Sequence, residues 1–219
     1  MRPLFRQTKG FTLVELLVVM GIIAILTAIS IPSMVGLLRG SRLTTGSQAL
    51  SGQLNFARQY AMAKNCQVEF RLYQLPDPST PSVTTPAIFR AFQCLAVPSD
   101  NSGITAITKL TFLPDQIYIV NDSTVSSLLK NPPAASGPTY VTGTAAAVPV
   151  GQYGSSSYNY FAFHFKADGS TDMNPNAASA WFLSLANRRD ALQSNGLPLN
   201  FVTLQVNALN GRVNSYRPN

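Results

Sequence analysis

The sequence has few of the side chains on which enzymes rely. It contains one histidine, two cysteines and nine acidic residues in 219, and only 11% of its residues are charged. It has no glycine-rich phosphate loop, no nucleophile elbow and no cluster of metal ligands. The histidine, His164, lies between Phe163 and Phe165, so strand alternation turns it away from the phenylalanines and toward solvent. We therefore predict no catalytic residue, no bound metal and no cofactor.

What the sequence does have is one long apolar run near its start. The run extends from Phe11 to Ile31 and carries a single acid, Glu15. At about 1.5 Å per residue, a helix of this length crosses a hydrocarbon core of roughly 30 Å. Arg2, Arg6 and Lys9 precede it without an acid. Because positive charge is retained on the cytoplasmic side, the rest of the chain is expected to face outward.

Residues 9–23, KGFTLVELLVVMGII, resemble the class III signal of type IV pilins and type II secretion pseudopilins. The resemblance implies that a prepilin peptidase cuts after Gly10 and that the new amino terminus on Phe11 is methylated. Two alternatives remain. An ordinary secretory signal has a shorter apolar stretch, of about 7 to 15 residues, and an uncleaved anchor gives no reason to keep an acid in the run.

Glu15 is the residue in this segment that most requires a partner. Cleavage after Gly10 would create an α-amino group about one helical turn before Glu15, and an ionisable group in a membrane helix needs a counter-charge. The two groups could meet within one chain, whereas helices packed with an axial stagger would bring Glu15 to the amino terminus of a neighbour. The resemblance implies the second arrangement, in which Glu15 fixes the register between subunits.

The helix is expected to continue past the membrane run to about Lys64. Pro32 lacks an amide hydrogen, so a kink or local melting is predicted there. Beyond it, apolar residues recur at helical spacing and would seat a folded domain. This stripe consists of Leu43, Leu50, Leu54, Ala57 and Ala61.

From residue 66 the pattern changes from helical periodicity to alternation. Val68, Phe70 and Leu72 predict the single buried face of a first strand, with residues 69, 71 and 73 on the other face. Further strands are predicted within 87–97, 109–120, 161–165, 180–189 and 200–218, turns at 167–169 and 210–211, and loops at 74–86 and 131–151. One long helix followed by antiparallel strands is an α+β fold.

The two cysteines lie near the outer ends of the first predicted hairpin. If Cys66 faced Cys94, the same register would set Val68 against Phe92, an apolar pair that cross-strand packing favours. A disulfide between them is one possibility in an oxidising compartment, and two free buried thiols are the other. Two cysteines without supporting histidines do not make a zinc site.

Two further resemblances concern the domain after the helix. The phenylalanine and glycine turn near residue 169, followed by a last strand ending in glycine and arginine, is similar to the GspH/FimT pseudopilin group. Residues 53–77, QLNFARQYAMAKNCQVEFRLYQLPD, resemble the prepilin-like Verru_Chthon cassette protein D. Neither resemblance implies an enzymatic activity.

Charge bears on one rival function, DNA binding by a minor pilin of the FimT type. The formal net charge is +7, but residues 65–219 hold nine basic and eight acidic residues. Nucleic-acid binding needs clustered Lys and Arg. The candidates are Arg188, Arg189, Arg212 and Arg217, and the alternative for these four is a sheet edge protected by charge.

The sequence thus predicts a pilin-like α+β structural subunit with a long amino-terminal membrane helix packed on an antiparallel β-sheet domain. Its expected parts are a leader at 1–10, a transmembrane helix at 11–31, an amphipathic stalk at 32–64 and a periplasmic β-rich domain at 65–219. We expect a single-pass protein of the bacterial inner membrane, with a cytoplasmic amino terminus. The resemblance implies a subunit of a type II secretion pseudopilus or type IV pilus, and the length of the chain and its long loops favour a minor subunit. The implied partners are the prepilin peptidase, other subunits and the inner-membrane assembly platform, and an uncleaved, anchored periplasmic binding domain is the alternative.

Overall fold

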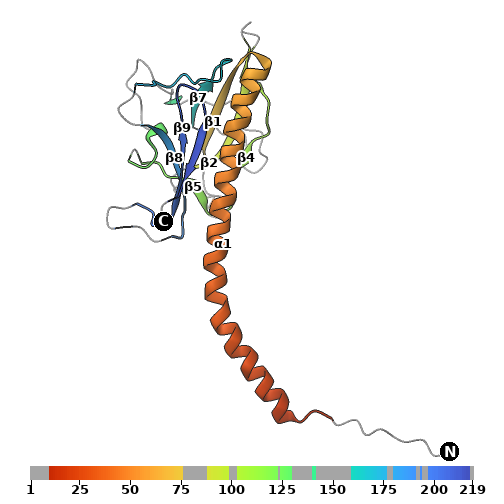
Figure 1. The fold of residues 1–219 in the computed structure, drawn as a ribbon. Helices are drawn as coiled ribbons and strands as arrows, with labels where there is room; N and C mark the ends of the chain where they lie inside the picture. Colours follow the sequence, from red (N-terminus) through yellow and green to blue (C-terminus); the bar gives the residue numbers. More distant parts are fainter. Residues whose placement is uncertain are drawn as a thin grey trace, which may run out of the picture. The chain divides into compact units, whose positions relative to one another are not determined.

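A computed structural model gives the fold, drawn as a ribbon in Figure 1. It describes residues 10–75, 88–98, 103–122, 124–129, 140–141, 159–176, 180–190, 193 and 197–217. The chain divides into two compact units, Met1–Ser41 and Arg42–Asn219. The second unit is called the headpiece below.

One long helix, α1 (Leu13–Lys64), contributes to both units. In the first unit every α1 side chain from Leu13 to Ser30 is exposed. In the headpiece the predicted apolar stripe is confirmed, because all five of its side chains are fully buried. They are Leu43, Leu50, Leu54, Ala57 and Ala61.

The backbone of α1 remains helical across Pro32. Local melting, one of the two outcomes predicted there, is therefore not observed. A kink at Pro32 stays a prediction.

The strands of the headpiece form one antiparallel sheet. In the described part of the chain they are β1 (Gln67–Leu75), β2 (Ile88–Val97), β3 (Thr105–Ala106), β4 (Thr111–Phe112), β5 (Ile117–Ile119), β6 (Tyr140–Val141), β7 (Tyr160–Phe165), β8 (Trp181–Asn187), β9 (Phe201–Val206) and β10 (Val213–Tyr216). Their order is β10-β9-β8-β5-β2-β1-β7-β6, with β3 and β4 paired to β2. A short 3-10 helix, η1 (Ser127–Leu129), packs against β8.

The core lies between the headpiece part of α1 and one face of this sheet, and Figure 1 shows the helix running along the strands. Phenylalanines from three neighbouring strands meet there, and the Phe70 ring lies 6.1 Å from Phe92 and 5.7 Å from Phe163. All three are fully buried, as alternation predicts. The predicted α+β class is confirmed.

The first strand differs from its prediction, because both of its faces are buried. Val68, Phe70 and Leu72 face the core as expected, but Glu69 and Tyr73 are also only 6% and 3% exposed. β1 is flanked by β2 and β7, and a second apolar cluster covers its other face. That cluster comprises Tyr73, Leu75, Ala91, Tyr160 and Ala162.

The predicted register of the β1 and β2 hairpin is wrong. Cys94 stands opposite Phe70, and Val68 stands opposite Ala96, so the pairing is displaced along the strands. Cys66 lies just before β1 and does not face Cys94, and both cysteines are free. The structure thus has the free thiols and not the disulfide, and burial raises the pKa of the Cys94 thiol to about 12.

The later turns and strands largely follow the sequence pattern. A turn at Lys166–Ser170 has Gly169 at φ 82°, and the turn between β9 and β10 has Gly211 at φ 61°. Segment 109–120 contains two short strands, β4 and β5, on either side of Pro114. The loop predicted at 131–151 contains the short strand β6, and the rest of that loop lies outside the described residues, as does most of the loop at 74–86.

Candidate functional site: the amino-terminal segment and the headpiece

The residues at the predicted cleavage position are open to solvent. Gly10 is exposed, and the Phe11 residue is 85% exposed. A Cβ atom added to Gly10 would meet nothing within 4 Å. Packing in this structure therefore gives no reason for a glycine at this position.

Glu15 takes part in a capping box at the start of α1. Its Oε2 accepts a hydrogen bond from the Thr12 amide at 2.9 Å and another from the Thr12 hydroxyl at 2.9 Å. In return the Glu15 amide donates to the Thr12 Oγ1 at 3.2 Å. Because the first amides of a helix have no partner within it, this reciprocal pair stabilises the helix start. The T-x-x-E spacing is a sequence signal for this cap that the prediction did not include.

Beyond the cap, α1 contains a segment that could cross a membrane. Leu13–Ser30 is long and apolar enough by length and composition, and none of it is covered by the rest of the chain. Glu15 is the one charged side chain in that segment. The exposed surface around Glu15 is therefore apolar on every side of the helix.

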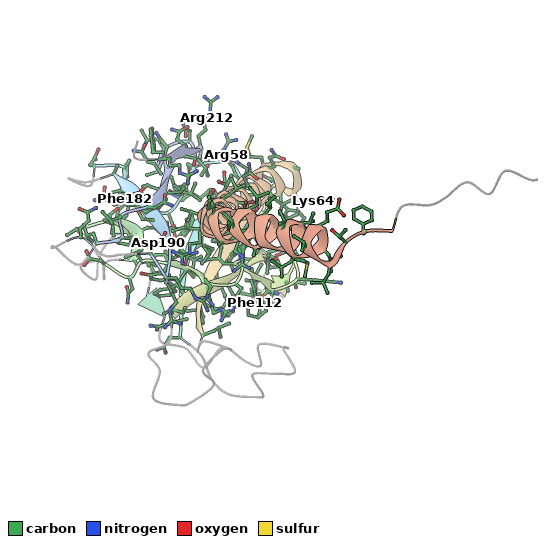
Figure 2. The ribbon with its side chains drawn as sticks, turned by 90° about the horizontal axis from the view of Figure 1, so that it is seen from below. Arg58, Lys64, Phe112, Phe182, Asp190 and Arg212 are labelled. Carbon is green, nitrogen blue, oxygen red and sulfur yellow. The ribbon has the colours of Figure 1, made fainter. Side chains whose placement is uncertain are left out.

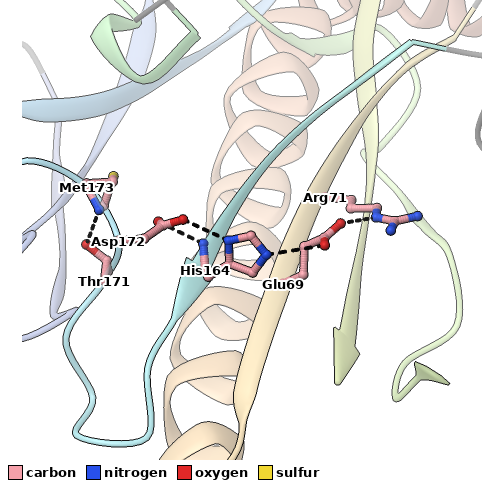
Figure 3. Close-up of polar contacts among 6 residues, drawn as sticks. All are labelled: Glu69, Arg71, His164, Thr171, Asp172 and Met173. Atoms are coloured by element: carbon pink, nitrogen blue, oxygen red, sulfur yellow. Dashed lines mark hydrogen bonds and ion pairs between the residues drawn. The ribbon is translucent and has the colours of Figure 1, made fainter. Parts of the chain in front are cut away.

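A second polar site lies in the headpiece, on the face of the sheet away from α1. Figure 3 shows His164 of β7 between two carboxylates. Its Nδ1 lies 2.7 Å from Asp172 Oδ2, and its Nε2 lies 3.3 Å from Glu69 Oε2. Asp172 also accepts a hydrogen bond from the His164 amide at 2.9 Å, and Glu69 is paired with Arg71. The prediction that His164 points freely into solvent is wrong, since its side chain is only 26% exposed.

The two carboxylates keep His164 protonated. Partial burial disfavours the charged imidazolium, but hydrogen bonds and charge from Asp172 and Glu69 outweigh it and raise the His164 pKa to about 9. Burial likewise opposes the charged form of Glu69, but hydrogen bonds from His164 and Arg71 lower the Glu69 pKa below its ordinary value. At neutral pH the group is therefore a chain of alternating charges, carboxylate, imidazolium, carboxylate and guanidinium.

This chain of charges is structural. It joins β7 to β1 and to the segment that follows the turn at Gly169. Asp168 is not part of it, because its carboxylate instead accepts hydrogen bonds from the Ser170 amide and hydroxyl. Among the described residues, no group of three or more His, Cys, Asp or Glu side chains could hold a metal ion.

The four arginines considered as a basic patch do not gather at one place. Arg212 precedes β10, next to the end of β9, whereas Arg188 and Arg189 follow β8 at the opposite end of the same strands. The register separates Arg212 from Arg188 by roughly 25 Å at 3.3 Å per residue. Arg217 lies toward the second end, within 3.4 Å of Asn200. Figure 2 shows Arg212 on the side of the headpiece where Arg58 lies, and Arg58 donates to the Asn210 carbonyl at 2.6 Å.

Parts of the chain are similar to known proteins. Residues 5–31 match the model of the prokaryotic N-terminal methylation motif. The chain is 32% identical over 126 residues to the type IV wide pilus major component PilA4 of Thermus thermophilus, covering 56% of this chain and 95% of that protein. Among solved structures it resembles the minor pseudopilin EpsH from the type 2 secretion system of Vibrio cholerae, at 11% identity and a TM-score of 0.39, over 81% of this chain and 98% of that one.

An exposed apolar helix that begins within a methylation motif and continues into an antiparallel headpiece defines a pilin-like subunit. The chain belongs to the type IV pilin and pseudopilin family. It is a structural subunit and not an enzyme.

Proposed function

We propose that this chain is a minor pseudopilin or minor pilin. Prepilin peptidase removes residues 1–10, Phe11 becomes the methylated amino terminus, and the helix that follows holds the chain in the inner membrane until assembly. The amino terminus faces the cytoplasm and the headpiece faces the periplasm. The observation that carries the proposal is Glu15, a lone acid in a fully exposed apolar segment that matches the methylation motif.

The capping box leaves part of Glu15 available for a second partner. Both hydrogen bonds that the Glu15 carboxylate accepts from described residues end on Oε2. Its other oxygen, Oε1, accepts none from the described residues. In a membrane or a filament core, a carboxylate oxygen without a partner is costly. The methylated amino terminus of a neighbouring subunit supplies a positive charge for Oε1. Glu15 then caps its own helix and fixes the register of the next one.

The assignment as a minor subunit draws on the size of the chain. The match to a major pilus component covers 56% of this chain, so a large part of the chain has no counterpart in that match. Residues beyond that match are available for contacts that a uniform filament does not need. We infer that the subunit occupies a special position in a pseudopilus or pilus.

Capping and intersubunit pairing can be separated by two variants. Glu15→Gln keeps a side-chain oxygen that can accept the cap hydrogen bonds but removes the charge. Thr12→Ala removes the cap hydroxyl and leaves the charge in place. We expect Glu15→Gln to reduce recovery in assembled fibres by about tenfold or more, and Thr12→Ala to assemble. The measurement is the ratio of sheared, assembled subunit to membrane-bound subunit in the native host.

Membrane insertion is the internal control, because both variants should remain in the membrane fraction at normal levels. Assembly of Glu15→Gln at the level of the unaltered chain would contradict the charge pairing. So would a failure of Thr12→Ala as complete as that of Glu15→Gln, because capping would then explain both results.

A further inference from the structure

One edge of β8 is covered by a neighbouring strand along only part of its length. In the sheet β8 lies between β9 and β5 (Figure 1), and β9 pairs with it from Trp181 to Ala186. On the other side β5 pairs only from Leu185 to Asn187. Among the described residues, no strand pairs with residues 181–184 of β8 on that side. An open edge with unpaired backbone groups is a template for pairing with another chain.

The register identifies the backbone groups that this edge presents. Continued past the end of β5, it would set Val120 opposite Ser184 and Asp122 opposite Phe182. The first of these pairs forms in part, because the Val120 amide donates to the Ser184 carbonyl at 2.8 Å. The chain then turns at Asp122, whose carbonyl accepts hydrogen bonds from amides within the turn. The amides of Ser184 and Phe182 therefore take their acceptors from elsewhere.

Two consecutive serines supply those acceptors. The Ser126 Oγ accepts from the Ser184 amide at 3.0 Å, and the Ser127 Oγ accepts from the Phe182 amide at 3.0 Å. The Ser127 hydroxyl donates in turn to the Ala180 carbonyl at 2.5 Å. Both serines are buried, Ser126 fully and Ser127 with 4% of its surface exposed. Their hydroxyls thus take the places that the backbone groups of a neighbouring strand would occupy.

The turn and η1 hold the two serines at this edge. The Asp122 Oδ1 accepts from the Thr124 amide at 2.7 Å and from the Thr124 hydroxyl at 2.6 Å, which closes the turn. The Ser126 carbonyl accepts from the Leu129 amide at 3.0 Å. Leu128 is fully buried in the main core of the headpiece. The serines are therefore fixed against β8 by a hydrogen-bonded turn and by an apolar anchor.

We propose that Ser126 and Ser127 block the open edge of β8 against pairing with the same edge of a second copy of this chain. A buried amide that loses its acceptor is costly, and an extended strand that pairs with the edge satisfies it again. The matching edge of a second copy offers the same donors and acceptors, so two copies can pair antiparallel about a two-fold axis. This block is independent of whether the subunit enters a pseudopilus or a pilus.

Single variants test the two hydrogen bonds separately. The full-length chain is isotope-labelled in detergent micelles, and the exchange of its amide hydrogens is followed by NMR. Ser126→Ala should speed exchange at the Ser184 amide by at least about tenfold and leave the Phe182 amide slow. Ser127→Ala should have the reverse effect. Equal acceleration at both amides in both variants would overturn the proposal, because the serines would then only stabilise the fold.

A double variant tests the pairing. Ser126→Ala combined with Ser127→Ala should form a dimer in sedimentation experiments, with a dissociation constant at least about tenfold below that of the unaltered chain. The two single variants should show smaller increases in association. Thr124→Ala is the matched control, because it removes a hydroxyl from the same turn without touching β8, and it should sediment like the unaltered chain. The proposal is overturned if neither the double variant nor the single variants associate more than the unaltered chain, or if Thr124→Ala associates equally.

Discussion

Two stretches of the same helix contrast with each other. From Leu13 to Ser30, α1 is apolar all round and wholly exposed. From Leu43 to Ala61 it is apolar on one stripe, and that stripe is fully buried against the sheet. Both stretches belong to one helix, yet they are suited to different surroundings.

The difference shows that periodicity, more than hydrophobicity, identifies the neighbour of a helix. A one-sided stripe requires a single partner, which here is the sheet of the same chain. An apolar surface on all sides requires an apolar medium or several other helices. The first stretch therefore needs packing partners outside the chain, whereas the second packs against the sheet of the same chain.

The largest effect should come from truncating the buried stripe. Leu54→Ala leaves a cavity under the sheet and should lower the free energy of unfolding of the headpiece by about 2 to 5 kcal/mol. Leu17→Ala, at a residue that is 65% exposed, is the matched control and should leave it unchanged. Denaturant unfolding followed by Trp181 emission measures both. Equal losses in the two variants would remove the distinction between the stretches.

Two glycines extend the comparison to the backbone. Gly211 has φ 61°, and a Cβ there would clash with the Gly169 carbonyl oxygen, so Gly211→Ala should cost about 2 to 4 kcal/mol. At Gly21 a Cβ meets nothing within 4 Å, and Gly21→Ala should leave the headpiece unaffected. Thermal unfolding distinguishes them. A Gly211→Ala headpiece as stable as the unaltered one would show that the turn is not packed as described.

The smallest effect is a dependence of stability on pH. The His164 pKa is raised from 6.5 to about 9, so its contribution is complete below about pH 6.5 and is lost as the pH rises through about 9. Over that window the free energy of unfolding of the headpiece should fall by about 1 to 2 kcal/mol. The fall should be smaller in His164→Gln. Leu13–Ser30 contains no histidine, so this loss belongs to the headpiece alone. A pH profile unchanged by His164→Gln would contradict the assigned role of the histidine.

Local features could be predicted from the sequence, because they depend on spacing along one element. The stripe from Leu43 to Ala61 and the turns at Gly169 and Gly211 are of this kind. The register of the hairpin formed by β1 and β2 could not be predicted in this way. It depends on an irregularity between Tyr73 and Gln74 and on neighbours on both sides of β1, which alternation within one strand does not reveal.

The charged network of His164 shows the same limit more sharply. His164 meets Glu69 because β7 pairs with β1, two strands far apart in the chain. No spacing in the sequence brings them together, and a lone histidine between phenylalanines indicates solvent when it is judged by its own strand. The Glu15 cap, by contrast, could have been predicted from the sequence, because Thr12 lies three residues before Glu15.

We propose that the exposed end of α1 is a processing and assembly signal. The most direct test is the intact mass of the chain extracted from the membranes of its native host, followed by sequencing of its amino-terminal peptide. We expect a chain that begins at Phe11 and carries one added methyl group on its amine. A chain that still contains residues 1–10, or one cut at the far side of the apolar run, would contradict it.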